Sequence, residues 1–238
     1  MPFDYATIPA GYYDAIFHRG RGVQSQWHRL KFAHFRAAMR GYRRHLDIGC
    51  GPGTLIGSLG IEHDSVGIDL AAGQIDYATT HYGAVNRRFQ VVSADGQLPF
   101  ADGSFDVITL VELIEHLPEQ EIMPLLSQAV RLLRPGGRLL ISTPDYGSLW
   151  PLIEALVNHL GPVDYSEQHI TRFNRARLSG LLMQIPALSV EGVARYMGLA
   201  PFLAAVSWQG SQRLSDWQLP TWMDGRFGLL LFAIAVKK

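Results

Sequence analysis

The chain has only one cysteine, Cys50, among its 238 residues. A lone cysteine cannot form an internal disulfide, so the fold must be stabilised by packing and hydrogen bonds, as in a reducing compartment. The first ten residues also lack the basic region and apolar core of a secretory signal peptide. We therefore expect a cytoplasmic protein.

An excess of charge is absent as well, because 21 Lys and Arg residues balance 21 Asp and Glu residues. Binding to nucleic acid draws on a basic surface, so the composition gives no reason to expect a nucleic-acid partner. The arginines at 87–88 and 172–177 are interpreted as solvated faces.

Long apolar runs are also missing. The longest stretches, 199–206 and 227–236, fall well short of the ~20 residues that cross a bilayer, so no transmembrane segment is expected. Apolar residues make up 47% of the chain and charged residues 18%, and no repeat or linker divides it. These values predict a single globular domain.

Short apolar strands alternate with helices over the first 143 residues, after an amphipathic helical stretch at 24–39. This pattern predicts a parallel, doubly wound α/β sheet with right-handed crossovers. Ligands of such sheets bind beyond the carboxyl ends of the strands. The predicted strands are 45–48, 65–69, 89–93, 105–111 and 138–142, and the predicted helices between them begin at 54 and span 72–82 and 119–133.

Beyond residue 143 the alternation loosens. Helices are predicted at 149–159 and 175–184, a strand at 188–195 and an apolar terminal strand at 228–236, whereas 197–222 receives no assignment. The run Arg134-Pro135-Gly136-Gly137 is interpreted as the stop signal of the preceding helix.

A glycine-rich turn, Asp47-Ile48-Gly49-Cys50-Gly51-Pro52-Gly53, follows the first strand. Gly49 and Gly51 allow a tight turn and a close ligand approach, although an ordinary strand-to-helix turn would need the same residues. Thr54 replaces the third glycine of a dinucleotide fingerprint. Asp47 would repel a pyrophosphate and is better suited to a cationic group. Cys50 is interpreted as a small packing residue.

Two further aspartates follow the second and third strands. Asp69 lies about 20 residues beyond the glycine turn, the spacing of a carboxylate that binds ribose hydroxyls, although it is also placed to cap the next helix. Asp95, with the amide of Gly96, is predicted to contact a heterocyclic base, the alternative being an ordinary turn aspartate. The fourth strand ends at Val111, on the expected wall of the site.

Together, the segments 46–53, 67–69, 94–100, 105–108 and 133–137 resemble a class I S-adenosylmethionine-dependent methyltransferase. The resemblance runs from about 43 to 143 and is strongest to the type 11 group, which is similar to the ubiquinone and menaquinone biosynthesis methyltransferases. It implies a Rossmann-like, mostly parallel seven-stranded sheet with the last strand antiparallel and helices on both faces.

The resemblance also implies where S-adenosyl-L-methionine binds. Asp47, Gly49 and Gly51 would hold its methionine portion, Asp69 the ribose and Asp95 the adenine, with Leu70 and Gly96 beside the adenosine. The implied division of the single domain is an N-terminal helical cap (1–40), a cofactor-binding core (43–143) and acceptor-side insertions with terminal strands (144–238).

The acceptor is expected to be a small molecule, quinone-, saccharide- or lipid-like, methylated on oxygen, carbon or nitrogen. His116 and His169 are the candidate bases, and structural roles are the alternative for both. Tyr12, Tyr13 and Trp27 belong either to a lid over the cofactor or to the core. No metal site is expected. The segments 1–40, 144–185 and 197–222 are apolar enough to form an acceptor pocket or a homodimer interface.

Two other classes of protein stay open beside an enzyme. One is a regulatory protein that binds S-adenosylmethionine without catalysis. The other is a nicotinamide dehydrogenase, which Thr54 and Asp47 disfavour because they break the dinucleotide fingerprint.

Overall fold

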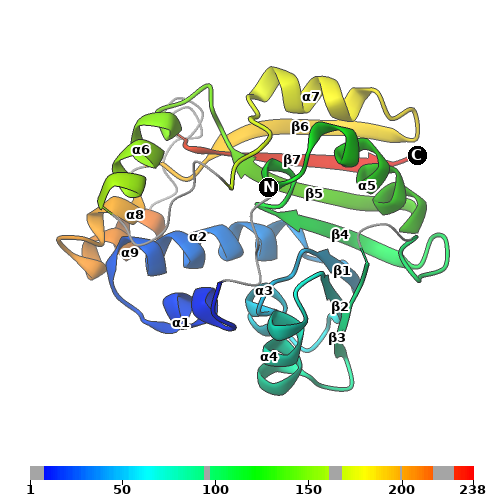
Figure 1. Cartoon of the computed structure of the whole chain (residues 1–238), viewed down its shortest axis with the longest axis horizontal. Coiled ribbons are helices and arrows are strands. Elements are labelled where there is room, and N and C mark those ends of the chain that lie inside the picture. Colours follow the sequence, from blue (N-terminus) through cyan, green and yellow to red (C-terminus); the bar gives the residue numbers. More distant parts are fainter. Residues whose placement is uncertain (1–7, 94–96, 161–167, 199, 217–227) are drawn as a thin grey trace.

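Seven strands form one sheet through the centre of the molecule (Figure 1). The computed structural model describes residues 8–93, 97–160, 168–198, 200–216 and 228–238. The strand order is β3-β2-β1-β4-β5-β7-β6. The strands span β1 (Arg44–Ile48), β2 (Asp64–Asp69), β3 (Arg87–Val91), β4 (Phe105–Val111), β5 (Leu133–Pro144), β6 (Leu188–Tyr196) and β7 (Leu230–Lys237).

The first five strands pair in parallel, and β7 runs antiparallel between β5 and β6. Parallel strands need crossover connections, which place helices on the faces of the sheet. The central strands β1 and β4 are accordingly buried along most of their length. This arrangement confirms the predicted fold class, including the antiparallel last strand.

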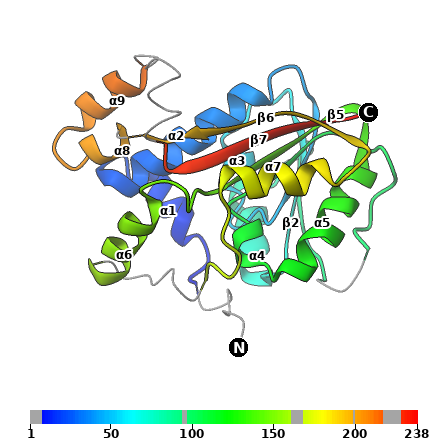
Figure 2. The same ribbon diagram turned by 90° about the horizontal axis from the view of Figure 1, so that it is seen from above.

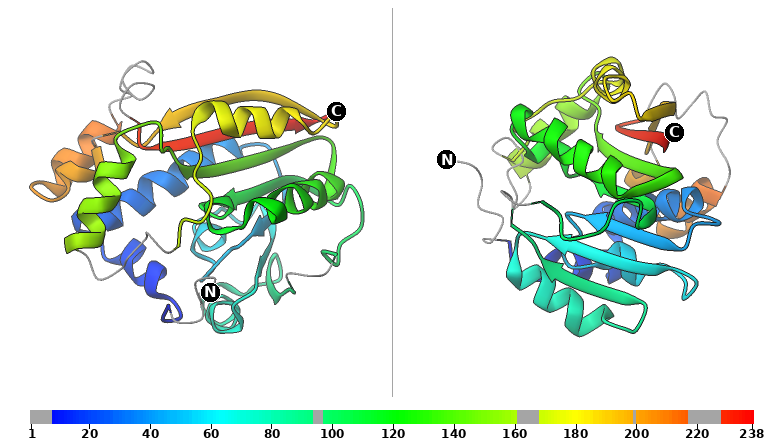
Figure 3. Two further views of the ribbon diagram at one scale, coloured as in Figure 1. Left: turned by 45° about the horizontal axis from the view of Figure 1, so that its top comes forward. Right: turned by 90° about the vertical axis from the view of Figure 1, so that its right-hand side faces the viewer.

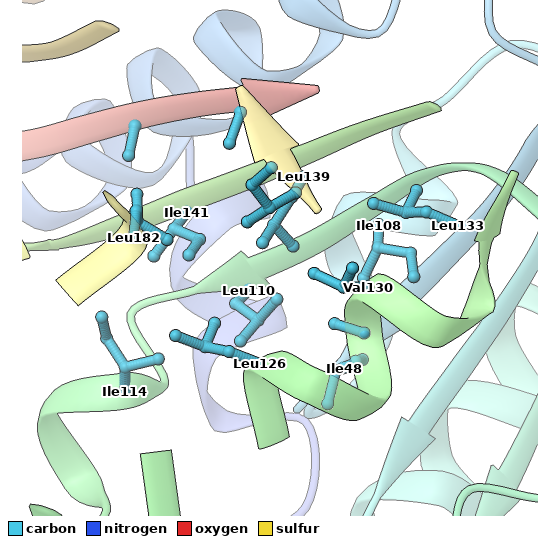
Figure 4. Packing of buried hydrophobic residues seen from close by; sticks show 14 of the residues in the cluster. Ile48, Ile108, Leu110, Ile114, Leu126, Val130, Leu133, Leu139, Ile141 and Leu182 are labelled. Atoms are coloured by element: carbon cyan, nitrogen blue, oxygen red, sulfur yellow. The ribbon is translucent and has the colours of Figure 1, made fainter. Parts of the chain in front are cut away.

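Helices α5 (Glu119–Leu132) and α7 (Arg175–Met183) cover one face of the sheet (Figures 1 and 2). In α5 the buried residues Ile122, Leu126, Ala129 and Val130 recur at helical spacing, so that they form one apolar stripe. Figure 4 shows Leu126 and Val130 against side chains of the sheet such as Leu110. This packing forms the larger of the two hydrophobic cores.

On the other face, the long helix α2 (Gly22–Ala38) lies with the short α3 (Thr54–Gly57) (Figure 3). Phe32 and Phe35 of α2 pack with Leu140 of β5 and Phe232 of β7, and the rings of Phe35 and Phe232 lie 4.9 Å apart. The helix α4 (Ala72–Tyr82) contacts α3, β2 and β3. The two faces of the sheet are thus both covered.

A group of helices gathers beyond the carboxyl ends of the parallel strands, on the left in Figure 1. They are α1 (Tyr12–His18), α6 (Trp150–Leu160), α8 (Ala200–Leu203) and α9 (Trp208–Asp216). A 3₁₀ turn, η2 (Ile114–His116), follows β4 at the same edge. Ligands of doubly wound sheets bind at this edge, so these elements frame the candidate site.

Most predicted elements appear within a few residues of their expected bounds, but the predicted start of the fifth strand is wrong. The chain passes from α5 directly into β5 at Leu133, which pairs with Phe105, so Arg134 to Gly137 belong to an irregular start of the strand. The segment without an assignment contains the helices α8 and α9. Among the described residues, no helix is long and apolar enough to cross a membrane. The division into cap, core and acceptor-side segments stays a prediction.

Candidate functional site

The glycine turn after β1 presents an open backbone surface at the carboxyl edge. Gly49 and Gly51 have φ of 73° and 51°, a region that favours glycine. The amides of Gly49 and Cys50 both donate to the Ile68 carbonyl, at 2.8 and 3.0 Å, which ties the turn to β2. A Cβ on Gly51 would meet no atom within 4 Å, whereas one on Gly49 would strike Leu113. A ligand can therefore approach the backbone closely at Gly51.

Asp69 is fixed beside this turn. One carboxylate oxygen accepts a hydrogen bond from the amide of Gly51 at 2.8 Å, and the other accepts one from the amide of Ala71 at 2.9 Å. The N-cap of α4 is Ala71 and not Asp69, so the capping alternative does not describe the structure. The two bonds hold the carboxylate in one orientation. Leu70 is 57% exposed beside it, where it can cover one side of a bound nucleoside.

Asp47 is a buried carboxylate without a cationic partner in direct contact among the described residues. Its register partner in β4, Thr109, donates a hydrogen bond to it at 2.5 Å. The Thr109 hydroxyl also lies 2.8 Å from Nε2 of His45. Because the one hydroxyl proton is donated to Asp47, Nε2 of His45 is the donor to Thr109. Burial lowers the pKa of His45 to about 3, so its ring is neutral. Burial raises the pKa of Asp47 to about 7, and the charge of Asp69 adds to this. A cationic ligand group would compensate the burial.

The wall beyond β4 contains a strained residue and a buried ion pair. Val111 ends the strand, and Glu112 follows with φ of 50°, which is rare for a residue with a side chain. Lys31 of α2 is only 4% exposed, and its Nζ lies 2.7 Å from Oε2 of Glu112. Such strained positions cluster at functional sites. Lys31 and Glu112 are site residues that the sequence patterns did not identify.

Of the remaining residues predicted to contact the cofactor, the structure describes Cys50 but not Asp95 and Gly96. Cys50 is buried at the base of the turn, and burial together with the charges of Asp47 and Asp69 raises the pKa of its thiol. This fits a packing residue. Asp95 and Gly96 lie outside the described residues.

His169 lies in a buried network on the acceptor side. Its Nδ1 is 2.5 Å from Oε1 of Glu154 in α6 and 2.9 Å from the hydroxyl of Tyr146, which itself donates to Glu154 at 2.8 Å. Burial lowers the pKa of His169, and the Glu154 carboxylate opposes this shift. The imidazole is therefore neutral at neutral pH. Because Nδ1 donates to Glu154, Nε2 is the nitrogen suited to accept a proton.

His116 is close to His169, with 5.2 Å between the ring centres. Its Nδ1 donates to the Gln168 carbonyl at 2.9 Å, and burial lowers its pKa to about 4. Ligand atoms of Glu115, His116 and His169 all lie within 4.8 Å of one another, a grouping compatible with a metal ion. Burial raises the pKa of Glu115 to about 8. Sequence spacing did not indicate this grouping, because His169 comes from a distant segment.

The first helix, α1, is attached to the two helices that follow the glycine turn and β2. Asp14 of α1 accepts hydrogen bonds from Thr54 of α3 and from Tyr77 and Tyr82 of α4, at 2.8, 2.9 and 2.5 Å. These bonds fasten α1 to the helix that follows the glycine turn.

Two aromatic residues of the N-terminal region, Tyr13 and Trp27, lie in different surroundings. Tyr13 is close enough to Glu112 that burial and this charge raise its pKa to about 12. Trp27 packs between Trp150 of α6 and Phe202 of α8, with ring centres 5.7 and 6.3 Å away. Trp27 thus contacts aromatic residues of two other helices.

The comparisons with known proteins agree with this geometry. Residues 46–141 match a family described as methyltransferase domain. The ubiquinone biosynthesis O-methyltransferase of Thiobacillus denitrificans is 32% identical over 118 residues, which cover 48% of this chain and 50% of that protein. A protein of the same name from Coxiella burnetii is also 32% identical over 118 residues, with coverage of 48% and 49%. The chain thus spans about half the length of the curated relatives it matches.

Solved structures show the same fold over nearly the whole chain. A SAM-dependent methyltransferase from Archaeoglobus fulgidus has a TM-score of 0.63 at 18% identity, covering 95% of this chain and 100% of that one. The plantazolicin methyltransferase BamL, solved with a desmethyl-plantazolicin analogue and SAH, has a TM-score of 0.61 at 19% identity, with coverage of 94% and 88%. Residues 46–141 thus carry the match to the methyltransferase domain family, and the fold of the chain is that of SAM-dependent methyltransferase structures.

Proposed function

We propose that the chain transfers the methyl group of S-adenosyl-L-methionine to an oxygen of a small apolar or amphiphilic acceptor. The observation that supports this proposal is that a pair of carboxylates and a buried histidine lie at the same edge of the sheet. The carboxylates of Asp47 and Asp69 flank the open Gly51 backbone, and the buried network of His169 and Glu154 follows β5.

The cofactor side fits the chemistry of S-adenosylmethionine. The buried Asp47 carboxylate suits the cofactor's ammonium group, and Gly51 leaves room for its methionine portion. Asp69 is oriented to accept hydrogen bonds from the ribose hydroxyls. When bound, the cofactor supplies an activated methyl group on a sulfonium, so the protein needs chiefly to position, desolvate and deprotonate the acceptor.

His169 supports the choice of an oxygen acceptor. A hydroxyl is a poor nucleophile until it loses its proton, and a neutral, buried imidazole can take that proton. Glu154 and Tyr146 hold the ring through Nδ1, which fixes the tautomer with Nε2 as the base. The relatives from Thiobacillus denitrificans and Coxiella burnetii carry the name O-methyltransferase, which agrees with this proposal.

The acceptor pocket is proposed between α2, α6 and α8. Trp27, Trp150 and Phe202 meet there, and the Trp150 ring lies 6.2 Å from that of His169. Aromatic walls next to a buried base suit a hydroxylated ring with an apolar substituent.

Two measurements test the proposal in sequence. Calorimetry should show that S-adenosylhomocysteine binds and that NADH does not, and binding of NADH instead would overturn the cofactor assignment. Phenols, catechols and matched anilines with alkyl tails of increasing length are then incubated with labelled S-adenosylmethionine. We expect methyl transfer to the hydroxylated compounds.

A histidine variant tests the role of the base. His169→Ala should reduce turnover by about 10²–10⁴-fold while its affinity for S-adenosylhomocysteine stays unchanged. His159→Ala, at an exposed position of α6, is the matched control and should keep full activity. Binding of S-adenosylhomocysteine without transfer to any compound would favour a cofactor-binding protein that lacks catalysis.

A further inference from the structure

A cavity lies at the edge of the sheet where β1 and β2 begin, opposite the carboxyl edge. Its volume is about 430 Å³, and it lies between the end of α2, the loop into β1 and the loop from α3 into β2. The carboxyl edge with Asp47 and Asp69 is at the far end of the same two strands. The cavity is therefore separate from the proposed cofactor site. The lining side chains that matter here are Arg36, Arg40, Arg43, Glu62 and His63.

The charge around this cavity is strongly one-sided. Three arginines, Arg36, Arg40 and Arg43, line the cavity together with a single acidic residue, Glu62. None of the three has a carboxylate within 4.0 Å in the part of the chain that the structure describes, whereas Arg88 and Arg134 elsewhere pair with aspartates. In a chain without net charge, this concentration of unpaired cations is a local feature.

Arg36 is a partly buried cation without a carboxylate partner among the described residues. In the part of the chain that the structure describes, its guanidinium makes one hydrogen bond, of 3.2 Å, to the neutral hydroxyl of Ser58. Burial lowers its pKa, and the charge of Arg29 adds to the effect. The carbonyls at the C-terminal end of α2 favour nearby cations, but they are neutral and do not supply the missing negative charge. An anion in the cavity would supply it.

His63 is a largely buried side chain in the wall of this cavity. Its side chain is only 8% exposed, and its Nε2 lies 3.5 Å from Glu62. Its Nδ1 is buried and has no hydrogen-bond partner among the described residues. Because this atom is shielded from solvent, a molecule in the cavity does not reach it, and the arginine side chains are the groups available to a ligand.

We propose that this cavity binds a small molecule through its phosphate group. Guanidinium groups match the oxygens of phosphate in a two-pronged geometry, and within the described part of the chain none of the three arginines has a carboxylate partner that an anion would have to displace. The volume exceeds that of a lone phosphate and lies within the range of small-ligand sites. Tyr42 and Leu59 provide apolar lining for the organic portion.

The experiment is calorimetry of the purified chain with inorganic phosphate and pyrophosphate, at an ionic strength matched with sodium chloride. We expect submillimolar binding of pyrophosphate, unchanged when S-adenosylhomocysteine saturates the other site. The variant Arg40→Gln should weaken it at least fivefold. Arg175→Gln removes an exposed charge from α7 and should have no effect.

Several outcomes would overturn the proposal. The first is that a folded protein binds no pyrophosphate at 10 mM, and the second is that S-adenosylhomocysteine displaces pyrophosphate. The third is that Arg175→Gln weakens pyrophosphate binding as much as Arg40→Gln does. The fourth is that citrate binds as tightly as pyrophosphate. Thermal unfolding of each variant confirms that it is folded. The test does not depend on methyl transfer, so this proposal and the proposed enzymatic activity can fail separately.

Discussion

Binding of S-adenosylhomocysteine should expel a proton from Asp47, and the affinity should therefore rise with pH. Burial holds the pKa of this carboxyl at about 7 without ligand, so about half of the molecules carry the proton at neutral pH. The ligand's ammonium group interacts favourably only with the carboxylate. An opposite charge at contact distance lowers a carboxyl pKa by about 1–3 units.

The size of the effect follows from these values. With a pKa of about 7 in the free protein and a decrease of about 2 units on binding, the affinity should fall roughly tenfold from pH 8 to pH 6, or about 1.4 kcal/mol. Calorimetry in buffers of different ionisation enthalpy measures the released protons directly. Asp47→Asn is the control that should remove the pH dependence, since Glu115 also titrates in this range. An affinity that is constant from pH 6 to 8, or proton uptake, would refute the assignment.

The same residue should affect the stability of the free protein. The pKa of Asp47 is higher in the folded state, at about 7, than its ordinary value of 3.8. The folded state therefore binds more protons between these values, and stability falls as pH rises from about 4 to 7. The full loss is roughly 4 kcal/mol at about 1.4 kcal/mol per pKa unit. Asp47→Asn should raise the melting temperature at pH 8 and have little effect at pH 4.

Three other substitutions test other parts of the site. Asp69→Ala should weaken binding of S-adenosylhomocysteine by about 1.5–3 kcal/mol, the value of a hydrogen bond to a charged group, and unchanged affinity in calorimetry would rule out its role. Because the Glu154 carboxylate raises the pKa of His169, Glu154→Gln should move the acid limb of the turnover profile to lower pH, and an unmoved limb would show that Glu154 does not act on the base. Lys31→Met leaves Glu112 without its partner and should lower the free energy of unfolding in urea by about 3 kcal/mol. Adding Glu112→Gln to this variant should restore most of that loss. A loss of under about 1 kcal/mol for Lys31→Met would contradict a stabilising role of the ion pair.

The parts of the site that sequence could predict are those set by local structure. Asp47 and Asp69 stand at the ends of strands, and the glycines between them require a turn, so their meeting at one edge follows from the parallel topology. The start of β5 was harder to predict, because Pro135 and Gly136 indicate a turn although the chain still pairs with β4 at Leu133.

Lys31 and Glu154 could not be assigned in this way, because their partners lie 81 and 15 residues away. A weak signal exists for each. Lys31 lies one helical turn from both Trp27 and Phe35, at a position where an apolar residue is the usual choice. Glu154 is the one acidic residue of a mostly apolar helix. A charged residue within an apolar stripe indicates a buried partner, but not which one.

The single cysteine has a practical consequence. Its thiol is buried under the glycine turn, and its raised pKa keeps it protonated and therefore slow to react. Alkylation of the native protein thus reports how often the turn opens, with no other thiol in the chain to add background. A cysteine introduced on the surface, by contrast, can carry a fluorophore while Cys50 stays unmodified.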